Sequence, residues 1–217
     1  MMEIFFFLML IVSFFIYWCV SEKTGLQLGI VVSLSMWAVS MYIHFGKDVF
    51  PRLDFSWVII ALLFILFILL RGKIEALILL GGSRVYIISA AAVSFLMILN
   101  RPSFEYVLPG GLLMGLSLGY FLNKRFLGFK SADTLQKKGA VKYLMLLMRF
   151  VLGIAVLSLI VYRVEKIIQR IAENQNIELY AFLCCVVVSL WISFAAPWFF
   201  IKLRLAGTEK NDDGKKE

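Results

Sequence analysis

The sequence contains a single histidine, His44, which stands four residues before a carboxylate, Asp48. On a continuing helical turn, residues four apart share a face. A carboxylate in that place can hold the imidazole in one tautomer and stabilise its cationic form, as a nucleophilic histidine requires. Ser40 precedes this pair, and Lys47 adds a cation that could bind a substrate phosphate. The alternative is an interfacial histidine beside solvated loop charges, and the spacing leaves both interpretations open.

Two arginines, Arg84 and Arg149, lie inside apolar runs, and within the predicted spans the acidic residues stand only at the first positions of two of them, Asp54 and Glu178. An arginine at the bilayer centre costs about 2.5–3.5 kcal/mol, so each must face protein, water or headgroups. At 1.5 Å per residue, both lie about 12 Å beyond the predicted entry of their span. One prediction is a shared polar site in which the two guanidinium groups bind a lipid phosphate as substrate. The other is that each side chain extends separately to the headgroups.

The elements that carry these residues are membrane helices. The chain is 62% hydrophobic and only 17% charged, whereas soluble domains carry about 25% charged residues. The sequence therefore predicts an all-α integral membrane protein, a bundle of about seven transmembrane helices, since each apolar run can cross a hydrocarbon core of about 30 Å. The predicted spans are residues 4–20, 26–45, 54–70, 76–99, 106–122, 141–162 and 178–203.

The chain is predicted to be one transmembrane helical domain, residues 1–206, followed by a disordered charged tail, residues 207–217. Residues 163–177 place isoleucines at helical spacing among charges, which predicts an amphipathic extension at the outer interface. The first apolar run has no basic residue before it and no small-x-small cleavage site after it. It is therefore predicted to be retained as a helix.

Basic residues outnumber acidic ones, which gives a net charge of +8, and the basic residues gather at the ends of spans. With seven spans, thirteen Lys and Arg residues fall on one side of the membrane and six on the other. The positive-inside rule then places the N-terminus outside and the C-terminus in the cytoplasm. This placement favours anionic or phosphorylated membrane lipids as partners and argues against nucleic acid.

Three glycines, Gly111, Gly115 and Gly119, lie four apart on one helix face. Such a face lets a neighbouring helix approach closely, either within the chain or from a second copy in a homo-oligomer. A ligand-facing groove is the alternative. The three cysteines, Cys19, Cys184 and Cys185, lie within apolar runs with no histidine nearby, which predicts small packing residues and no metal or cofactor.

Three segments resemble bacterial membrane phosphatases of the type 2 phosphatidic acid phosphatase superfamily. They are Tyr17–Leu26, Pro109–Phe129 (PGGLLMGLSLGYFLNKRFLGF) and Trp191–Leu205 (WISFAAPWFFIKLRL). The last two are similar to the extra helical module that some bacterial members carry after the phosphatase core. The resemblance implies a location in the bacterial inner membrane and hydrolysis of a lipid-linked phosphate.

Members of that superfamily carry three sequence blocks: Lys-x6-Arg-Pro, Pro-Ser-Gly-His and Ser-Arg-x5-His-x3-Asp. Only the third has a candidate, in which the resemblance implies that His44 attacks phosphorus and Asp48 orients it, with Ser40 ahead of them. Met41 stands where the block needs arginine, and Pro-Ser-Gly-His is missing from the sequence.

These departures remove groups that clamp the phosphate oxygens and protonate the leaving group. The sequence therefore predicts a relative of the lipid phosphate phosphatases whose hydrolase activity is in question. The alternative is a non-enzymatic membrane protein for lipid binding, transport or assembly.

Overall fold

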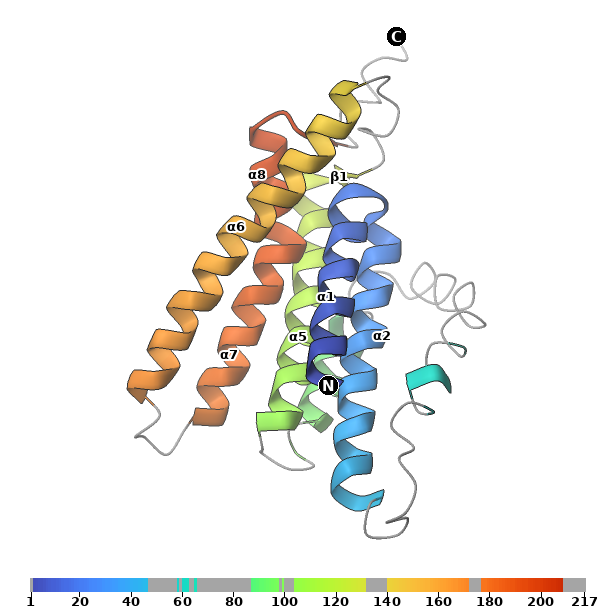
Figure 1. The fold of residues 1–217 in the computed structure, drawn as a ribbon, viewed down its shortest axis with the longest axis vertical. Helices are drawn as coiled ribbons and strands as arrows, with labels where there is room; N and C mark the ends of the chain where they lie inside the picture. Colours follow the sequence, from blue (N-terminus) through green and yellow to red (C-terminus); the bar gives the residue numbers. More distant parts are fainter. Residues whose placement is uncertain are drawn as a thin grey trace.

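The structure, a computed structural model, describes residues 2–46, 58, 60–62, 65, 87–97, 99, 104–131, 140–171 and 177–208. Its long helices run side by side in one elongated bundle (Figure 1). The elements are α1 (Met2–Cys19), α2 (Glu22–Met41), η1 (Tyr42–Gly46), α5 (Phe104–Leu122), η2 (Asn123–Leu127), β1 (Phe129–Lys130), α6 (Ala140–Ile171), α7 (Ile177–Leu190), η4 (Trp191–Ala195), α8 (Ala196–Lys202) and β2 (Gly207–Thr208). The elements labelled η are π-helical turns. The predicted all-α membrane fold is confirmed.

Four of the described helices are long and apolar enough to cross a membrane, and two further apolar helices are shorter. The long ones are Glu22–His44, Tyr106–Leu127, Ala140–Arg163 and Glu178–Lys202, and the shorter ones are Phe6–Cys19 and Ile87–Met97. Each corresponds to a predicted apolar run. The predicted span at 54–70 falls mostly outside the described residues.

Helices α1 and α2 form an antiparallel hairpin. The Ser21 side chain ends the turn by accepting the Thr24 N–H at 3.3 Å, which caps the start of α2. A Cβ atom at Gly25 would collide with the backbone of Tyr17, so only glycine allows this close approach. The Ser13 hydroxyl donates to the Gly25 carbonyl at 2.7 Å across the same contact.

The three glycines of α5 pack against α7 and η4. A Cβ atom at Gly111 would stand 2.8 Å from the Phe182 carbonyl oxygen, and one at Gly115 would stand 2.6 Å from that of Val186. Both distances are too short for any side chain. The prediction that a neighbouring helix packs closely on this face is therefore confirmed for α7 of the same chain. A second copy could bind this face only if α7 moved away.

Two serines complete this interface from the opposite helix. The Ser189 hydroxyl donates to the Gly111 carbonyl at 3.4 Å, and the Ser193 hydroxyl donates to the Gly115 carbonyl at 3.3 Å. Each hydroxyl also bonds a carbonyl one turn back in its own chain segment. The Ser189 hydroxyl bonds the Cys185 carbonyl at 2.5 Å, and the Ser193 hydroxyl bonds the Ser189 carbonyl at 2.6 Å. Small residues and weak interhelical hydrogen bonds thus hold α5 and α7 together, as is typical of membrane helices.

Helix α6 crosses the outside of the bundle (Figure 1). At 1.5 Å per residue its 32 residues extend about 48 Å, longer than a hydrocarbon core of about 30 Å. The helix continues through Ile171, so the first part of the predicted extension at 163–177 prolongs this span.

The chain after α8 returns to the bundle as a short strand. Gly207 and Thr208 in β2 pair antiparallel with Lys130 and Phe129 in β1. Gly207 and Thr208, the first two residues of the predicted disordered tail, therefore lie in a short strand. The remainder of the predicted tail lies outside the described residues.

Candidate functional site

The predicted catalytic residues fall at one end of α2. Ser40 lies in the last turn of the helix, and its carbonyl accepts a hydrogen bond from the Tyr106 hydroxyl at 3.4 Å. His44 is exposed and belongs to the π-helical turn η1. Asp48 and Lys47 lie outside the described residues.

Arg149 lies at the opposite end of α2. The Ser131 hydroxyl donates to Glu22 Oε2 at 2.7 Å, and the Ser131 carbonyl accepts from Arg149 Nη1 at 3.3 Å. Glu22 begins α2, and His44 lies 22 residues further along, about 33 Å away at 1.5 Å per residue. His44 and Arg149 therefore cannot bind one phosphate together. Arg84, the third predicted contact, lies outside the described residues.

The Arg149 side chain is completely buried, with 0% of its surface exposed. Its extension to the headgroups, one of the two predicted alternatives, is therefore wrong. Nε and Nη2 donate to the Leu205 carbonyl at 3.0 and 2.5 Å, and Nη1 donates to the Trp18 carbonyl at 2.9 Å. The guanidinium carbon also lies 5.8 Å from the centre of the Phe129 ring. Carbonyl dipoles from three distant segments stabilise this buried cation. The sequence indicated only that Arg149 must face protein, water or headgroups, because no residue type marks a carbonyl partner.

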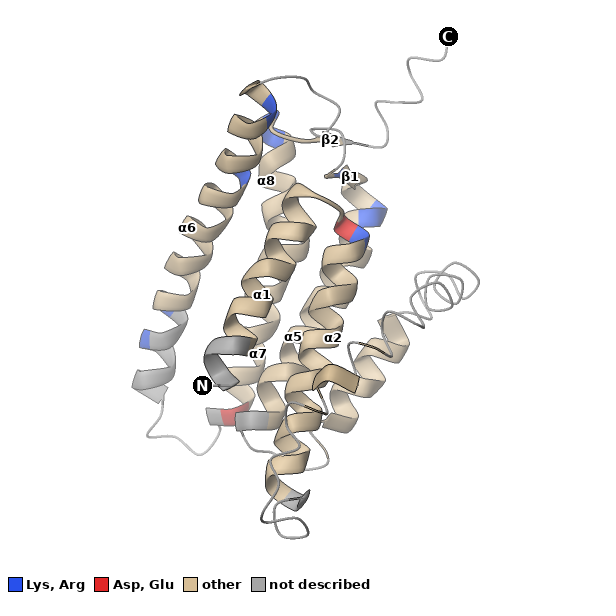
Figure 2. Ribbon diagram, turned by 45° about the vertical axis from the view of Figure 1, so that its right-hand side comes forward, with Lys and Arg blue, Asp and Glu red and all other residues tan. Residues whose placement is uncertain are grey.

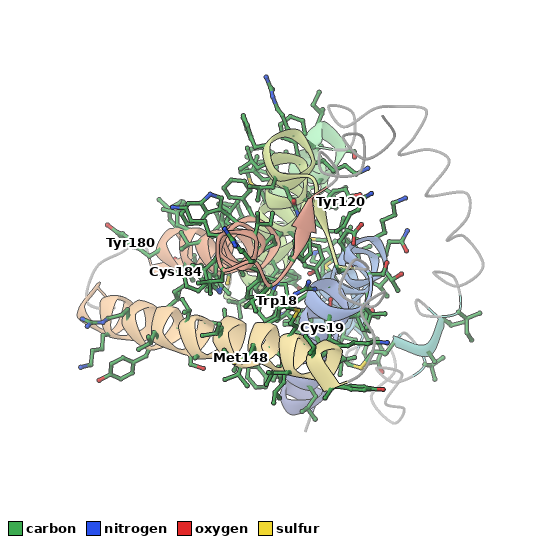
Figure 3. The ribbon with its side chains drawn as sticks, turned by 90° about the horizontal axis from the view of Figure 1, so that it is seen from above. Trp18, Cys19, Tyr120, Met148, Tyr180 and Cys184 are labelled. Atoms are coloured by element: carbon green, nitrogen blue, oxygen red, sulfur yellow. The ribbon has the colours of Figure 1, made fainter. Side chains whose placement is uncertain are left out.

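Next to Arg149, two aromatic residues of α1 bind the π-helical turn η4. Tyr17 Oη donates to the Ser193 carbonyl at 2.8 Å, and Trp18 Nε1 donates to the Ile192 carbonyl at 2.9 Å. Pro197 lacks the N–H that would reach Ser193 in an α-helix or Ile192 in a π-helix. These two carbonyls are therefore available to α1. Seen from above, Trp18 lies at the centre of the molecule, between α6 and the other helices (Figure 3).

Asn123 extends the same network to η2 and β1. Its Nδ2 donates to Tyr17 Oη at 3.0 Å, and its Oδ1 accepts the Phe129 N–H at 3.2 Å. The Phe129 ring stacks on Tyr17, with ring centres 6.5 Å apart. Tyr17, Trp18, Asn123, Ser131 and Arg149 thus form one buried polar network that joins both termini to the middle of the chain.

Exposed cations cover the end of the bundle above this network. We define the basic face by its exposed members, Lys23, Lys124, Arg125, Lys202 and Arg204. Most of the described Lys and Arg residues gather at this end, and a smaller group lies at the far end of α6 (Figure 2). Glu22 is the acidic side chain that the structure describes here, and it accepts hydrogen bonds from Ser131.

Cation–aromatic pairs lie near both ends of the bundle, where the two membrane interfaces are expected. At the basic face, Lys202 Nζ lies 4.4 Å from the centre of the Trp198 ring, and at the other end Lys166 Nζ lies 4.7 Å from that of Tyr162. Aromatic rings and long cationic side chains are enriched at membrane interfaces. On α6, the Lys142–Tyr143 pair and Tyr162 are about 30 Å apart at 1.5 Å per residue, which is the thickness of a hydrocarbon core.

These features define a multi-pass helical membrane protein with a buried polar network beneath a basic face. Residues 107–208 match the family described as PAP2 superfamily phosphatase, transmembrane extension. This match, which covers slightly less than half of the chain, confirms the predicted resemblance for that part and is consistent with a PAP2-related membrane protein. It runs from α5 to β2, so the hairpin of α1 and α2 that packs against this module lies before it. No curated protein and no solved structure matches the chain.

Proposed function

We propose that this protein binds anionic or phosphorylated lipids at its basic face and does not itself hydrolyse them. The observation that carries this proposal is the separation of the predicted site residues. His44 lies about 33 Å along α2 from the end that holds Arg149 and the basic face. The proposal corresponds to the lipid-binding alternative raised by the sequence.

Phosphoryl transfer needs a nucleophile and a set of cations on the same phosphate, together with a proton donor for the leaving group. Arg149 is engaged with backbone carbonyls, and the exposed cations of the basic face lie at its end of α2, not at the end that carries His44. Lipid binding needs less, because each Lys or Arg near an anionic membrane surface contributes about 1 kcal/mol. The basic face meets this requirement.

Hydrolysis remains the second candidate function, and the geometry around His44 favours it. His44 is exposed within a π-helical turn at the end of a span, and such turns are frequent at functional sites. In this case His44 would attack phosphorus, with Asp48 as its orienting partner and Lys47 on the phosphate.

Purified protein in nanodiscs separates the two functions. The protein should bind phosphatidic acid in preference to phosphatidylcholine, measured by native mass spectrometry of the lipids retained. It should release no phosphate from phosphatidic acid or from a prenyl diphosphate. Equal retention of both lipids would refute the proposed binding. Robust phosphate release that disappears in His44→Ala would establish the hydrolase instead, and release that survives this change would exclude His44 as the nucleophile.

We further propose that the basic face lies in the cytoplasm of a bacterial inner membrane. The exposed cations at this end and the positive-inside rule support that orientation. Lys124→Cys should be protected from an impermeant thiol reagent added outside intact cells, whereas Lys166→Cys should react. The reverse pattern would invert the orientation. The native cysteines lie within apolar helices and would first be replaced by serine or alanine.

A further inference from the structure

Arg204 has an unusual backbone conformation. Its φ angle is +55°, and within the part of the chain that the structure describes it is the non-glycine residue with a positive φ. For an L-residue the left-handed conformation costs roughly 1–2 kcal/mol, because Cβ approaches the following carbonyl oxygen. The side chain is exposed, so packing does not explain why a large residue occupies this position.

The backbone around Arg204 forms a helix-ending motif in which glycine is the usual residue. The Leu205 N–H bonds the Phe200 carbonyl at 2.9 Å, and the Arg204 N–H bonds the Ile201 carbonyl at 2.9 Å. These are the two hydrogen bonds of a Schellman motif, with Arg204 at the left-handed position.

The same end of the molecule contains a comparable turn built with glycine. The π-helical turn η2 ends at Gly128, which has a φ angle of +58° and donates its N–H to the Asn123 carbonyl at 2.9 Å. Thus the chain uses glycine for one left-handed ending and arginine for the other. Because glycine would relieve the strain at Arg204, the guanidinium group must supply something that glycine lacks.

The segment that carries Arg204 is fixed on both sides. Before it, α8 packs against η2 and β1. After it, the Leu205 carbonyl accepts two hydrogen bonds from Arg149, and Gly207 and Thr208 pair with β1. Arg204 therefore projects from a backbone that the buried polar network holds in place, at the end that carries the other cations of the basic face.

We propose that Arg204 is the phosphate-binding residue of an anionic-lipid site on the basic face. A strained residue held at a defined point is a common property of ligand-binding sites. Guanidinium binds a phosphate through two parallel N–H bonds, which makes it selective for a phosphate headgroup. Lys202, two residues earlier, contacts the interfacial Trp198 ring, so Arg204 lies at the level of the headgroups. This inference rests on the proposed lipid binding and adds the residue that performs it.

Arg204 also follows the C-terminus of α8, where a cation stabilises the helix dipole by about 0.3–1 kcal/mol. This purely structural role predicts different behaviour for substitutions. It would be served equally by lysine and would not affect lipid selectivity.

Three variants separate charge, geometry and strain: Arg204→Gly, Arg204→Gln and Arg204→Lys. The matched control is Arg125→Gln, which removes an exposed cation from the same face. Phosphatidic acid in phosphatidylcholine nanodiscs is the probe, with inorganic phosphate as competitor.

Arg204→Gly and Arg204→Gln should weaken phosphatidic acid binding about tenfold, equivalent to about 1.4 kcal/mol. Arg204→Lys should recover part of this loss, and Arg125→Gln should reduce binding about fivefold or less, as for one diffuse charge. Arg204→Gly should also melt at a higher temperature than Arg204→Gln.

The outcomes distinguish this inference from the proposed function. If wild-type protein shows no preference for phosphatidic acid, the proposed function fails and this inference fails with it. If wild type prefers phosphatidic acid and Arg204→Gly binds it equally well, only the assignment to Arg204 fails. Equal losses in Arg204→Gly and Arg125→Gln would likewise overturn it in favour of diffuse attraction. Displacement of the lipid by millimolar inorganic phosphate would show a site for free phosphate and overturn the commitment to a lipid.

Discussion

Helices α5 and α6 both have the length and composition of a membrane span, yet α5 lies inside the bundle and α6 lies on its outside. Within the described structure, 72% of the α5 span is buried inside the protein, against 11% of the α6 span. The more apolar of the two is α6, which lies on the outside. In lipid, apolar side chains gain little from leaving the solvent for the protein interior. Burial is decided instead by close packing of small residues and by hydrogen bonds between helices.

The two helices are attached to the bundle in different ways. Helix α5 uses a continuous face of glycines against two serines of the opposite helix. Helix α6 makes its closest contact at Gly153, where a Cβ atom would collide with the Trp18 ring, and is hydrogen-bonded through Arg149 one turn away, with partly buried apolar side chains such as Phe150 packed beside them. If this comparison is right, substitutions on the glycine face of α5 should act through sterics, and substitution of Arg149 on α6 through the loss of its hydrogen bonds.

The largest effect is expected for Gly115→Leu. A side chain here would collide with Ser189 and with the Val186 carbonyl, so the helices would have to separate along the whole interface. We expect a loss of about 3 kcal/mol or more in the free energy of unfolding, measured by denaturant titration in detergent. Met114→Leu, a volume-conserving change beside it, is the control. Near-normal stability of Gly115→Leu would show that α7 is not held by this face.

A smaller loss is expected for Arg149→Met. The variant keeps a long unbranched side chain but leaves the carbonyls of Trp18, Ser131 and Leu205 without their donor, which should cost about 2 kcal/mol. The damage should concentrate at the basic end. Amide hydrogen exchange should therefore rise first at residues 203–208 and 129–131, while residues 111–119 stay protected. Uniform loosening of the whole bundle would contradict the local role assigned to Arg149.

The smallest effect is expected for Leu147→Ala on the outer face of α6. The Leu147 side chain is 58% exposed within the protein, so lipid can replace its contacts. The free energy of unfolding should change by less than about 0.5 kcal/mol, as for most exposed substitutions. A loss comparable to that of Arg149→Met would indicate that another protein, and not lipid, covers this face.

Sequence reasoning was most successful where a property is local. Apolar runs located the spans, because hydropathy can be read from a window of about 20 residues. The glycine spacing on α5 predicted a close helix contact for the same reason, since residues four apart must share a face. It could not name α7 as the neighbour, and it left a second copy of the chain as an alternative.

The candidate site was less predictable. The sequence identified Arg149 as anomalous, but it paired this residue with Arg84 and a lipid phosphate at one depth. Its described partners are carbonyls of Trp18, Ser131 and Leu205, which lie 131, 18 and 56 residues away along the chain. Every residue has a carbonyl, so no residue type marks such a partner. Arg204 was only one of the basic residues counted after the last predicted span began, because the residue type arginine does not indicate a positive φ angle.

By itself, the sequence determined that this chain is an all-α membrane protein, where the apolar helices that the structure describes fall, and that cations gather at the ends of those helices. These outcomes follow from the transfer of side chains between water and lipid, which depends on residue type. Tertiary structure decided which helix is central, which carbonyls receive the buried arginine, and that His44 and Arg149 stand at opposite ends of α2. Those outcomes depend on contacts between segments far apart in the chain, which spacing within one segment does not encode.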